Sequence, residues 1–230
     1  MNDRDEPTGE SPEPGGEASS HERGIESLAE ATRELIDRIR RTQAPVEELA
    51  AAREAIESIT DQLDVWAHDG PYAQAALDGS IGLIGQSRDP MRIFPYSPLI
   101  GRLNPVAPPA EFRHEDGKVI GEVTLGPAYC GPPHHVHGGV VAALMDELLG
   151  TVNVVNGLGA MTGRLTIHYR AATPLGVPLR LEASHTGSEG RKVYAEGRIL
   201  DGERLLVEAE GLFVRPRDAS LFAQDAGPAT

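Results

Sequence analysis

The 230-residue chain is short of cysteine, of basic residues and of long apolar runs. Its single cysteine, Cys130, excludes an intramolecular disulfide and a cysteine-based zinc cluster. No apolar run approaches the roughly 18 residues that span a bilayer. The first twenty residues are acidic instead of basic and apolar, so no signal peptide is visible. We therefore expect a reducing, cytoplasmic setting and no membrane span.

Positive charge is scarcest in the first part of the chain. Residues 1–70 contain 18 acidic and 7 basic residues, a net charge of −11, whereas the remainder contains 17 and 14, a net charge of −3. Nucleic acid is a polyanion, so this distribution disfavours nucleic-acid binding. The acidity belongs mainly to the N-terminal region and not to the part that contains the motifs described below.

Three common enzyme motifs are also missing. No GxSxG sequence is present, which disfavours an α/β-hydrolase. The segment 157–163, GLGAMTG, has neither the P-loop lysine nor the dinucleotide-binding spacing, so it is better explained as a turn into a strand. His134, His135 and His137 lie close together, but they lack a helical i, i+4 pair and obvious carboxylate partners. We expect no metal there, and an inert thiol at Cys130.

The strongest positive signal is the segment 137–150, HGGVVAALMDELLG. It starts with two glycines, continues as an almost wholly apolar run and contains two adjacent acids, Asp146 and Glu147. Apolar residues on every face of a predicted helix indicate burial. An acid in a buried helix costs free energy unless another group uses or satisfies it. The segment is therefore the best candidate for a catalytic helix.

Helical spacing distinguishes the two acids. Gly139 and Asp146 are seven residues apart and lie on nearly the same face, whereas Glu147 points about 100° away. The bare backbone N–H groups of Gly138 and Gly139 at the helix start suit a developing oxyanion. Seven residues span roughly 10 Å along the axis, so one carbonyl group cannot touch both ends. Two antiparallel helices of a two-fold dimer would bring Gly139 of one subunit to Asp146 of the other.

Five residues stand at a recognisable spacing: His137, Gly138, Gly139, Asp146 nine residues after the histidine, and Thr162 sixteen residues beyond that. Together with CGPP at residues 130–133, this pattern resembles the hotdog-fold acyl-CoA thioesterases of the phenylacetate-degradation (PaaI-like) group. The resemblance covers about residues 95–217. It implies an α+β fold in which an antiparallel sheet wraps around one long central helix. It also implies hydrolysis of an acyl-CoA thioester, with no cofactor, by a homodimer or a dimer of dimers.

The resemblance implies a role for each residue. Asp146 would activate a water molecule or attack the thioester itself, and both remain open. Gly139 would donate its backbone N–H to the thioester oxygen, Thr162 would position the water, and His137 would contact the thioester region or fix the glycine loop. The structural alternatives are a core or capping aspartate, a strand threonine and a histidine that only holds the turn.

One position departs from the family pattern. Many members have an asparagine six residues before the HGG histidine, where it polarises the carbonyl group, and here that position is Gly131. A second donor must then come from His134 or His135, or be absent.

Coenzyme A carries phosphates, so cations are expected near the mouth of the site. Arg191 and Lys192, which follow Gly190 at the start of a predicted strand, match a glycine-basic feature of the family. Arg164 and Arg170 are secondary candidates. For all four, a solvated surface is the alternative.

Composition and periodicity divide the chain into five segments: a disordered acidic tail (1–24), an amphipathic helical hairpin (25–69), a Gly/Pro-rich connection (70–109), the thioesterase domain (110–217) and a loose tail (218–230). The hairpin contains helices at 25–41 and 45–66 and would pack against the hotdog units, link them or dock a partner. Strands are predicted at 111–114, 118–125, 162–171, 178–186, 191–200 and 204–214. They do not alternate with helices, which favours α+β. Apolar residues within 91–100 would cover an acyl pocket or join the core.

Two other functions stay open. A hotdog dehydratase or hydratase needs an acid and a histidine over the acyl α and β carbons, and the HGG-to-aspartate spacing does not clearly offer that pair. A non-catalytic acyl-CoA-binding or scaffold protein would keep the fold and contact partners through the helical arm. Turnover of acyl-CoA thioesters separates it from an enzyme.

Overall fold

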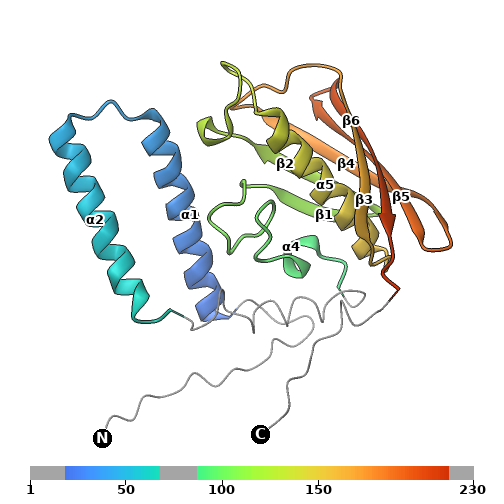
Figure 1. The fold of residues 1–230 in the computed structure, drawn as a ribbon, viewed down its shortest axis with the longest axis horizontal. Coiled ribbons are helices and arrows are strands. Elements are labelled where there is room, and N and C mark those ends of the chain that lie inside the picture. The colour runs from blue at the N-terminus through green and yellow to red at the C-terminus, as the bar shows by residue number, and fades with distance from the viewer. Residues whose placement is uncertain (1–18, 68–86, 218–230) are drawn as a thin grey trace, which may run out of the picture.

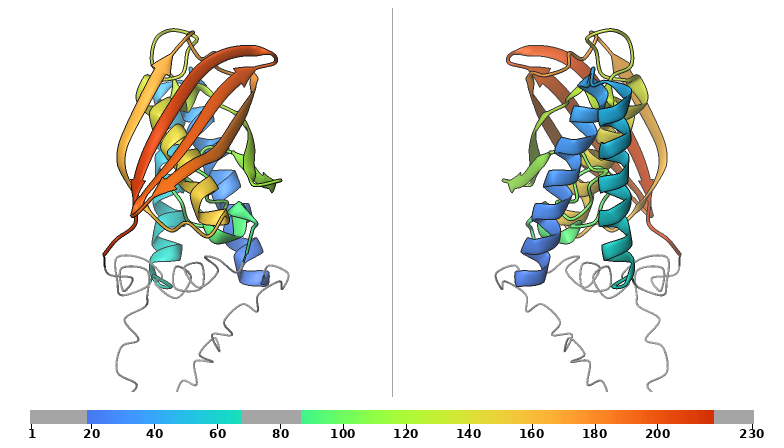
Figure 2. Two further views of the ribbon diagram at one scale, coloured as in Figure 1. Left: turned by 90° about the vertical axis from the view of Figure 1, so that its right-hand side faces the viewer. Right: turned by 90° about the vertical axis from the view of Figure 1, so that its left-hand side faces the viewer.

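The computed structural model describes residues 19–67 and 87–217. Most of the predicted acidic tail, part of the predicted connection and the predicted C-terminal tail lie outside the described residues. In the described part, one curved sheet wraps around helix α5 (Gly138–Val155), and two long helices lie along one flank (Figures 1 and 2). The predicted α+β hotdog arrangement is confirmed.

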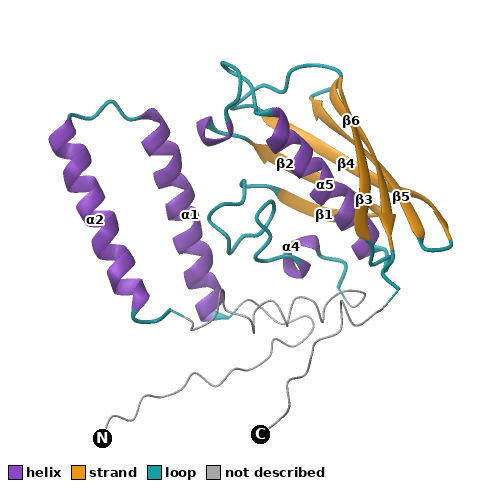
Figure 3. Cartoon of the chain, viewed as in Figure 1, coloured by secondary structure: helices purple, strands orange, loops and turns teal. Residues whose placement is uncertain are grey.

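Six antiparallel strands form the sheet, in the order β1-β2-β4-β5-β6-β3 (Figure 3). Their bounds are Glu111–Glu115 (β1), Lys118–Thr124 (β2), Met161–Tyr169 (β3), Pro178–Glu189 (β4), Lys192–Asp201 (β5) and Arg204–Val214 (β6). All six predicted strands are present, and the last has its predicted bounds. Within residues 19–67 and 87–217, strand β3 lies at the edge of the sheet and pairs only with β6. Its place at the edge is not apparent from the order of the strands in the sequence.

Helix α5 extends five residues beyond the predicted end at Gly150, because residues 151–155 are all buried and continue the helix into the core. Leu144, Leu148 and Leu149 are almost completely buried against the sheet. The expectation of burial on every face is only partly met, since Asp146 is partly exposed in this chain. Among the described helices, only α5 is long and apolar enough to cross a membrane. The buried core helix of a protein that does not cross a membrane has the same length and composition.

Two glycines on the inner face of the sheet let α5 approach closely. An ideal Cβ at Gly197 would lie 2.9 Å from the Glu182 carbonyl oxygen and 3.0 Å from Leu149 Cδ2. At Gly211 it would lie 3.2 Å from Leu149 Cδ1. Larger side chains at these two positions would push the helix away from the sheet.

The first helix, α1 (Ser20–Arg41), begins five residues earlier than the periodicity predicts. Residues 20–24, which were predicted to belong to the disordered tail, are therefore helical. Ser19 and Glu22 form a capping box: the Ser19 side chain accepts from the Glu22 backbone N–H, and the Glu22 carboxylate accepts from the Ser19 N–H. This signal is present in the sequence, but the apolar spacing alone does not reveal it. The second helix, α2 (Val46–Asp64), follows a short turn and has no buried residue.

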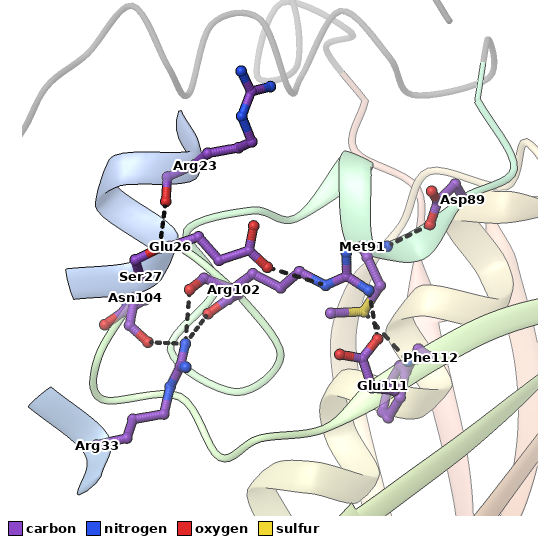
Figure 4. A network of polar contacts seen from close by, with 11 residues as sticks. Arg23, Glu26, Ser27, Arg33, Asp89, Met91, Arg102, Asn104, Glu111 and Phe112 are labelled. Carbon is purple, nitrogen blue, oxygen red and sulfur yellow. Dashed lines mark hydrogen bonds and ion pairs between the residues drawn. The ribbon is translucent and has the colours of Figure 1, made fainter. Parts of the chain in front are cut away.

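A polar contact joins α1 to the body of the protein (Figure 4). One guanidinium nitrogen of Arg33 donates to the carbonyl oxygens of Gly101, Arg102 and Asn104, at 3.4, 2.7 and 3.2 Å. The Arg102 side chain in turn pairs with Glu111 at 2.5 Å. Only Ala29 of α1 is buried. Helix α1 is therefore held mainly by hydrogen bonds to loop carbonyls and not by an apolar seam.

The described part of the predicted connection is ordered against the core. It contains the short helix α4 (Pro90–Ile93), whose first turn is capped by Asp89. Met91, Ile93 and Ile100 belong to the main hydrophobic core. Of the two roles considered for residues 91–100, packing in the core is the one that the structure shows.

Replacing Gly197 by alanine should destabilise the fold, because the new methyl group would contact Glu182 and Leu149 below van der Waals distance. We expect the free energy of unfolding to fall by about 1–3 kcal/mol, the usual cost of overpacking. Gly187 in β4 is the matched control, since nothing lies within 4 Å of its ideal Cβ and its φ is not positive. Gly187→Ala should be neutral or stabilising by up to about 1 kcal/mol. Equal urea midpoints for the two variants would contradict this account.

Candidate active site

Strand β3 brings Thr162 to Asp146. The Thr162 hydroxyl donates to Asp146 Oδ1 at 2.8 Å, and Asp146 remains partly exposed in the middle of α5. The strand has an irregularity between Thr162 and Arg164, where its register with β6 shifts by one residue. This bulge allows Thr162 and Leu165 both to face the helix side of the sheet. The two predicted residues are thus in direct contact.

The start of α5 is organised by His137. Its side-chain Nδ1 accepts the backbone N–H of Gly139 at 3.0 Å, and its carbonyl oxygen accepts from Val140 and Val141. Gly138 is the first-turn residue whose N–H has no acceptor within the described part of the chain. The predicted donor, Gly139, therefore uses its N–H to hold the histidine, and the neighbouring glycine presents the unused N–H.

Tyr169, at the other end of β3, also contacts the helix start. Its hydroxyl donates to the Gly138 carbonyl oxygen at 2.8 Å, while about half of the residue remains exposed. Strand β3 consequently touches both parts of the candidate site, with Thr162 at the acid and Tyr169 at the glycine turn. Sequence reasoning did not identify Tyr169, because a tyrosine in a strand gives no signal of which helix it faces.

Steric crowding explains why residue 131 is glycine here and not the asparagine of many family members. The Gly131 N–H donates to the His135 carbonyl oxygen, and the His137 N–H donates to that of Tyr129, which makes a tight loop before α5. An ideal Cβ at Gly131 would lie 2.7 Å from His137 Cα. Asparagine would not fit in this loop without a backbone shift.

His134 and His135, the predicted alternative donors, belong to the same loop. His134 has a positive φ of 64°, and its carbonyl oxygen accepts from the Leu175 N–H. The His135 Nδ1 lies 2.8 Å from the Pro133 carbonyl oxygen. No hydrogen bond among the described residues joins either imidazole to Gly138 or Asp146. The described residues also contain no cluster of metal ligands.

Glu147 faces a different neighbour from Asp146. Its carboxylate accepts the Ser97 hydroxyl at 2.7 Å, and the Ser97 oxygen itself accepts the Leu99 N–H at 3.1 Å. Burial raises the pKa of Glu147; the adjacent Asp146 raises it further, and the Ser97 hydrogen bond opposes the shift. The predicted difference in direction between the two acids is present, while the Ser97 partner was not predictable from spacing.

The four candidate cations do not form one cluster. Arg164 and Lys192 lie near the same end of the sheet as Thr162, because Arg164 pairs with Leu212 and Lys192 with Val214. The Arg191 side chain donates to the backbone carbonyl oxygen of Arg215 at 2.7 Å. Arg170 follows β3 at its opposite end and pairs with Glu208 at 2.7 Å.

Arg170 also lines a cavity of about 470 Å³ that includes the outward side chains Glu182 and Glu196 on the sheet face turned away from α5. A second cavity, of about 660 Å³, lies between α1 and the loop near Arg102. Asp146, Gly138 and Thr162 line neither of them. The candidate catalytic groups lie instead along the open side of α5 and β3.

A curved antiparallel sheet around one core helix defines the hotdog class of fold, and comparison with known proteins agrees. Residues 134–208 match the family model described as the thioesterase superfamily. The crystal structure of protein RHA08564, a thioesterase superfamily protein, is 33% identical, with a TM-score of 0.73 over 86% of this chain and 92% of that one. The chain belongs to the thioesterase superfamily.

Curated relatives match a shorter part of the chain. Acyl-coenzyme A thioesterase THEM4 of Xenopus laevis is 36% identical over 92 residues, which is 39% of this chain and 41% of that protein. The Mus musculus protein of the same name is 34% identical over 87 residues, 37% of each chain. The match thus spans less than half the length of these relatives.

Replacing Glu147 by glutamine should change how stability depends on pH. Because the folded state raises the pKa of Glu147, it binds more protons than the unfolded state once the pH exceeds the ordinary glutamate value of about 4.3. Wild-type stability should therefore fall relative to Glu147→Gln as the pH rises from there to the raised pKa, and the difference should then level off. Urea unfolding between pH 4 and 8 measures this. Parallel stability curves for the two proteins would show that Glu147 titrates normally.

Proposed function

We propose that this protein hydrolyses an acyl-CoA thioester to a free carboxylic acid and CoA, at a site completed by a second copy of the chain. The observation that carries the proposal is the hydrogen bond from the Thr162 hydroxyl to Asp146, on a partly exposed surface of α5. The family membership and the acyl-coenzyme A thioesterases among the curated relatives support the same reaction. The reaction needs no metal or redox cofactor, because a carboxylate supplies the base.

Asp146 and Thr162 together suit the activation of water. The ionised carboxylate can only accept hydrogen bonds, so the Thr162 hydroxyl must donate its hydrogen to it. The lone pairs of that hydroxyl are then left to accept from a water molecule, whose second hydrogen points to the carboxylate. This orients the water oxygen toward a thioester carbonyl carbon. Asp146 takes the proton as the carbon–oxygen bond forms. The C–S bond then breaks as the oxyanion returns to a carbonyl group, and the sulfur leaves with its bonding electrons and takes the proton back from Asp146 to become the thiol.

The negative charge that develops on the carbonyl oxygen is assigned to Gly138. Its N–H has no acceptor among the described residues and lies in the first turn of an 18-residue helix, where the helix dipole is favourable. Gly139 is the less suitable donor because its N–H is bonded to His137. We assign His137 and Gly139 to the support of the turn, and Tyr169 to the same support through the Gly138 carbonyl.

Two copies are needed because Gly138 and Asp146 are eight residues apart on one helix, about 12 Å along the axis. The nine-residue strand β3 has no buried residue, and its outer edge has no strand partner among the described residues. An exposed edge of this length is a template for pairing with another strand. Two-fold pairing of β3 would set the α5 helices antiparallel, with Gly138 of one copy toward Asp146 of the other.

Replacing Asp146 by asparagine should abolish thioester hydrolysis while the fold is kept, because the amide cannot accept the water proton. We expect kcat to fall by about 100-fold or more, the usual contribution of a general base. The control is Glu147→Gln, which makes the same chemical change one residue away on the side facing Ser97. Release of free thiol from a panel of acyl-CoA esters measures both. Near-normal turnover by the Asp146 variant would reject the assignment.

Mixing two inactive chains tests whether the site is shared. Asp146→Asn and Gly138→Val chains, each inactive alone, should recover activity when co-expressed, because every mixed dimer contains one site with both defects and one intact site. Random pairing predicts about a quarter of wild-type activity. If the residues of one chain make a complete site, every site has a defect and the mixture stays inactive.

A further inference from the structure

The exposed apolar side chains of the protein are concentrated on α1, α2 and the turn after α2. The described residues include fourteen large apolar residues that are exposed, and eleven of them lie between residues 28 and 66. They are Leu28, Leu35, Ile36, Ile39, Val46, Leu49, Ile56, Ile59, Leu63, Val65 and Trp66, with exposed fractions from 36% to 85%. A concentration of this kind marks an interaction surface more often than a free one.

Part of the apolar surface of α1 points away from its own chain, whereas Ile36 lines the cavity between α1 and the loop near Arg102. The side that meets the body contains Ala29 and Arg33, and the Arg33 contact is a set of hydrogen bonds to carbonyl oxygens. At 100° per residue, Leu28, Leu35 and Ile39 lie about 120° round the helix from the middle of that side. The body of the protein therefore leaves this stripe uncovered, although the helix is amphipathic.

The apolar positions of both helices follow the spacing of a helical bundle. In α1 the apolar residues Ile25, Leu28, Leu35 and Ile39, with the polar Thr32 between Leu28 and Leu35, stand in steps of three and four. In and just after α2 the same steps connect Leu49, Ala52, Ile56, Ile59, Leu63 and Trp66. Such a 3-4 repeat is the seam by which helices pack knobs into holes. Nothing in α2 is buried, so its seam has no partner within the described chain.

We propose that α1 and α2 pair with the same two helices of a second copy to form an intermolecular four-helix bundle. The exposed area of the eleven apolar residues is on the order of 1,000 Å², no less than the roughly 800 Å² that each partner contributes to a standard interface. A second copy presents an identical seam of the same length, and a two-fold axis makes the contact self-complementary.

The charges on the helices agree with a two-fold arrangement. The last turn of α1 is basic (Arg38, Arg40 and Arg41). The second half of α2 contains Glu57, Asp61 and Asp64 and no base, although Arg53 in the first half pairs with Glu57 at 2.6 Å. Because the two helices run antiparallel, these regions lie at opposite ends of one hairpin (Figure 1). A two-fold axis across the helices sets α2 of one copy parallel to α1 of the other and brings the acidic end beside the basic end.

A second copy suits this surface better than a lipid bilayer. Helix α2 has six acidic residues and one basic residue, and negatively charged membrane surfaces attract basic segments instead. The helical arm also has a counterpart in a relative: the alignment with RHA08564 covers 86% of the chain, more than residues 87–230 can supply. The arm is thus part of the fold that the two proteins share.

The bundle joins a surface other than the edge of β3. In Figure 1, α2 lies on the far side of α1 from the sheet, and β3 belongs to the sheet. Pairing through both surfaces gives a dimer of dimers, whereas pairing through the arm alone gives a dimer. The proposal does not rest on the thioesterase activity and stands or falls separately from it.

The test compares the mass of the full chain with that of two variants, measured by sedimentation and native mass spectrometry. Ile59→Glu places a charge in the seam of each copy and should halve the assembly mass, with association weakened by about 100-fold or more. Ser58→Glu adds the same charge one residue away, about 100° round α2 from Ile59 and outside the seam, and should keep the wild-type mass. Equal masses for all three proteins, or a wild type with no arm-dependent assembly, would overturn the proposal.

Hydrogen exchange distinguishes a second copy from other occupants. An isolated helix of this length is marginally stable in water, so the amides of α2 should be protected in the purified wild type and lose protection in Ile59→Glu. Amides of β4 and β5 should not change, which shows that the core stays folded. Protection of α2 in a monomer would mean that the arm covers its own chain. Unprotected α2 in the pure protein would mean that a different partner covers it. Either result contradicts the bundle.

Discussion

The contact between the edge strand β3 and the core helix α5 is the constraint on which the candidate site depends. One end of the strand gives the Thr162 hydroxyl to Asp146, and the other gives the Tyr169 hydroxyl to the Gly138 carbonyl oxygen. Both contacts require α5 to lie close to the sheet, and the glycine at position 197 permits that approach. Close packing of the core and the placement of the reactive groups are therefore one property of the fold and not two.

Two adjacent acids on α5 show how the direction of a side chain decides its chemistry. Asp146 is partly exposed and accepts a hydrogen bond from a strand hydroxyl. Glu147 faces the segment that contains Ser97 and lies in surroundings that raise its pKa. The 100° step of the helix separates the two environments. Helix α5 thus supplies Asp146 to the candidate site, and it supplies Glu147 to a hydrogen bond with Ser97 in the preceding segment.

The helical arm and the hotdog unit are stabilised by different kinds of interaction. Apolar packing from both α5 and the sheet fills the core, whereas α1 is held through Arg33 and loop carbonyl oxygens. The curated relatives align with this chain over less than half of its length, while the solved RHA08564 structure aligns with most of it. The arm is therefore best understood as an addition that the hotdog unit does not need for its own core.

Periodicity in the sequence was enough to predict the core helix and the six strands, because it reports which residues of an element share a face. The family was recognised from the spacing of His137, Asp146 and Thr162, whereas the hydrogen bond between the Thr162 hydroxyl and Asp146 was not predicted. A capping box at Ser19 was also readable, although the apolar pattern missed it. Contacts between distant segments were decided by the tertiary structure alone. The edge position of β3, the bond between Ser97 and Glu147 fifty residues away, and the steric exclusion at Gly131 depend on how strands pair and loops close. The tertiary structure also decides whether Gly138 or Gly139 has a free N–H, because the His137 ring accepts the N–H of Gly139.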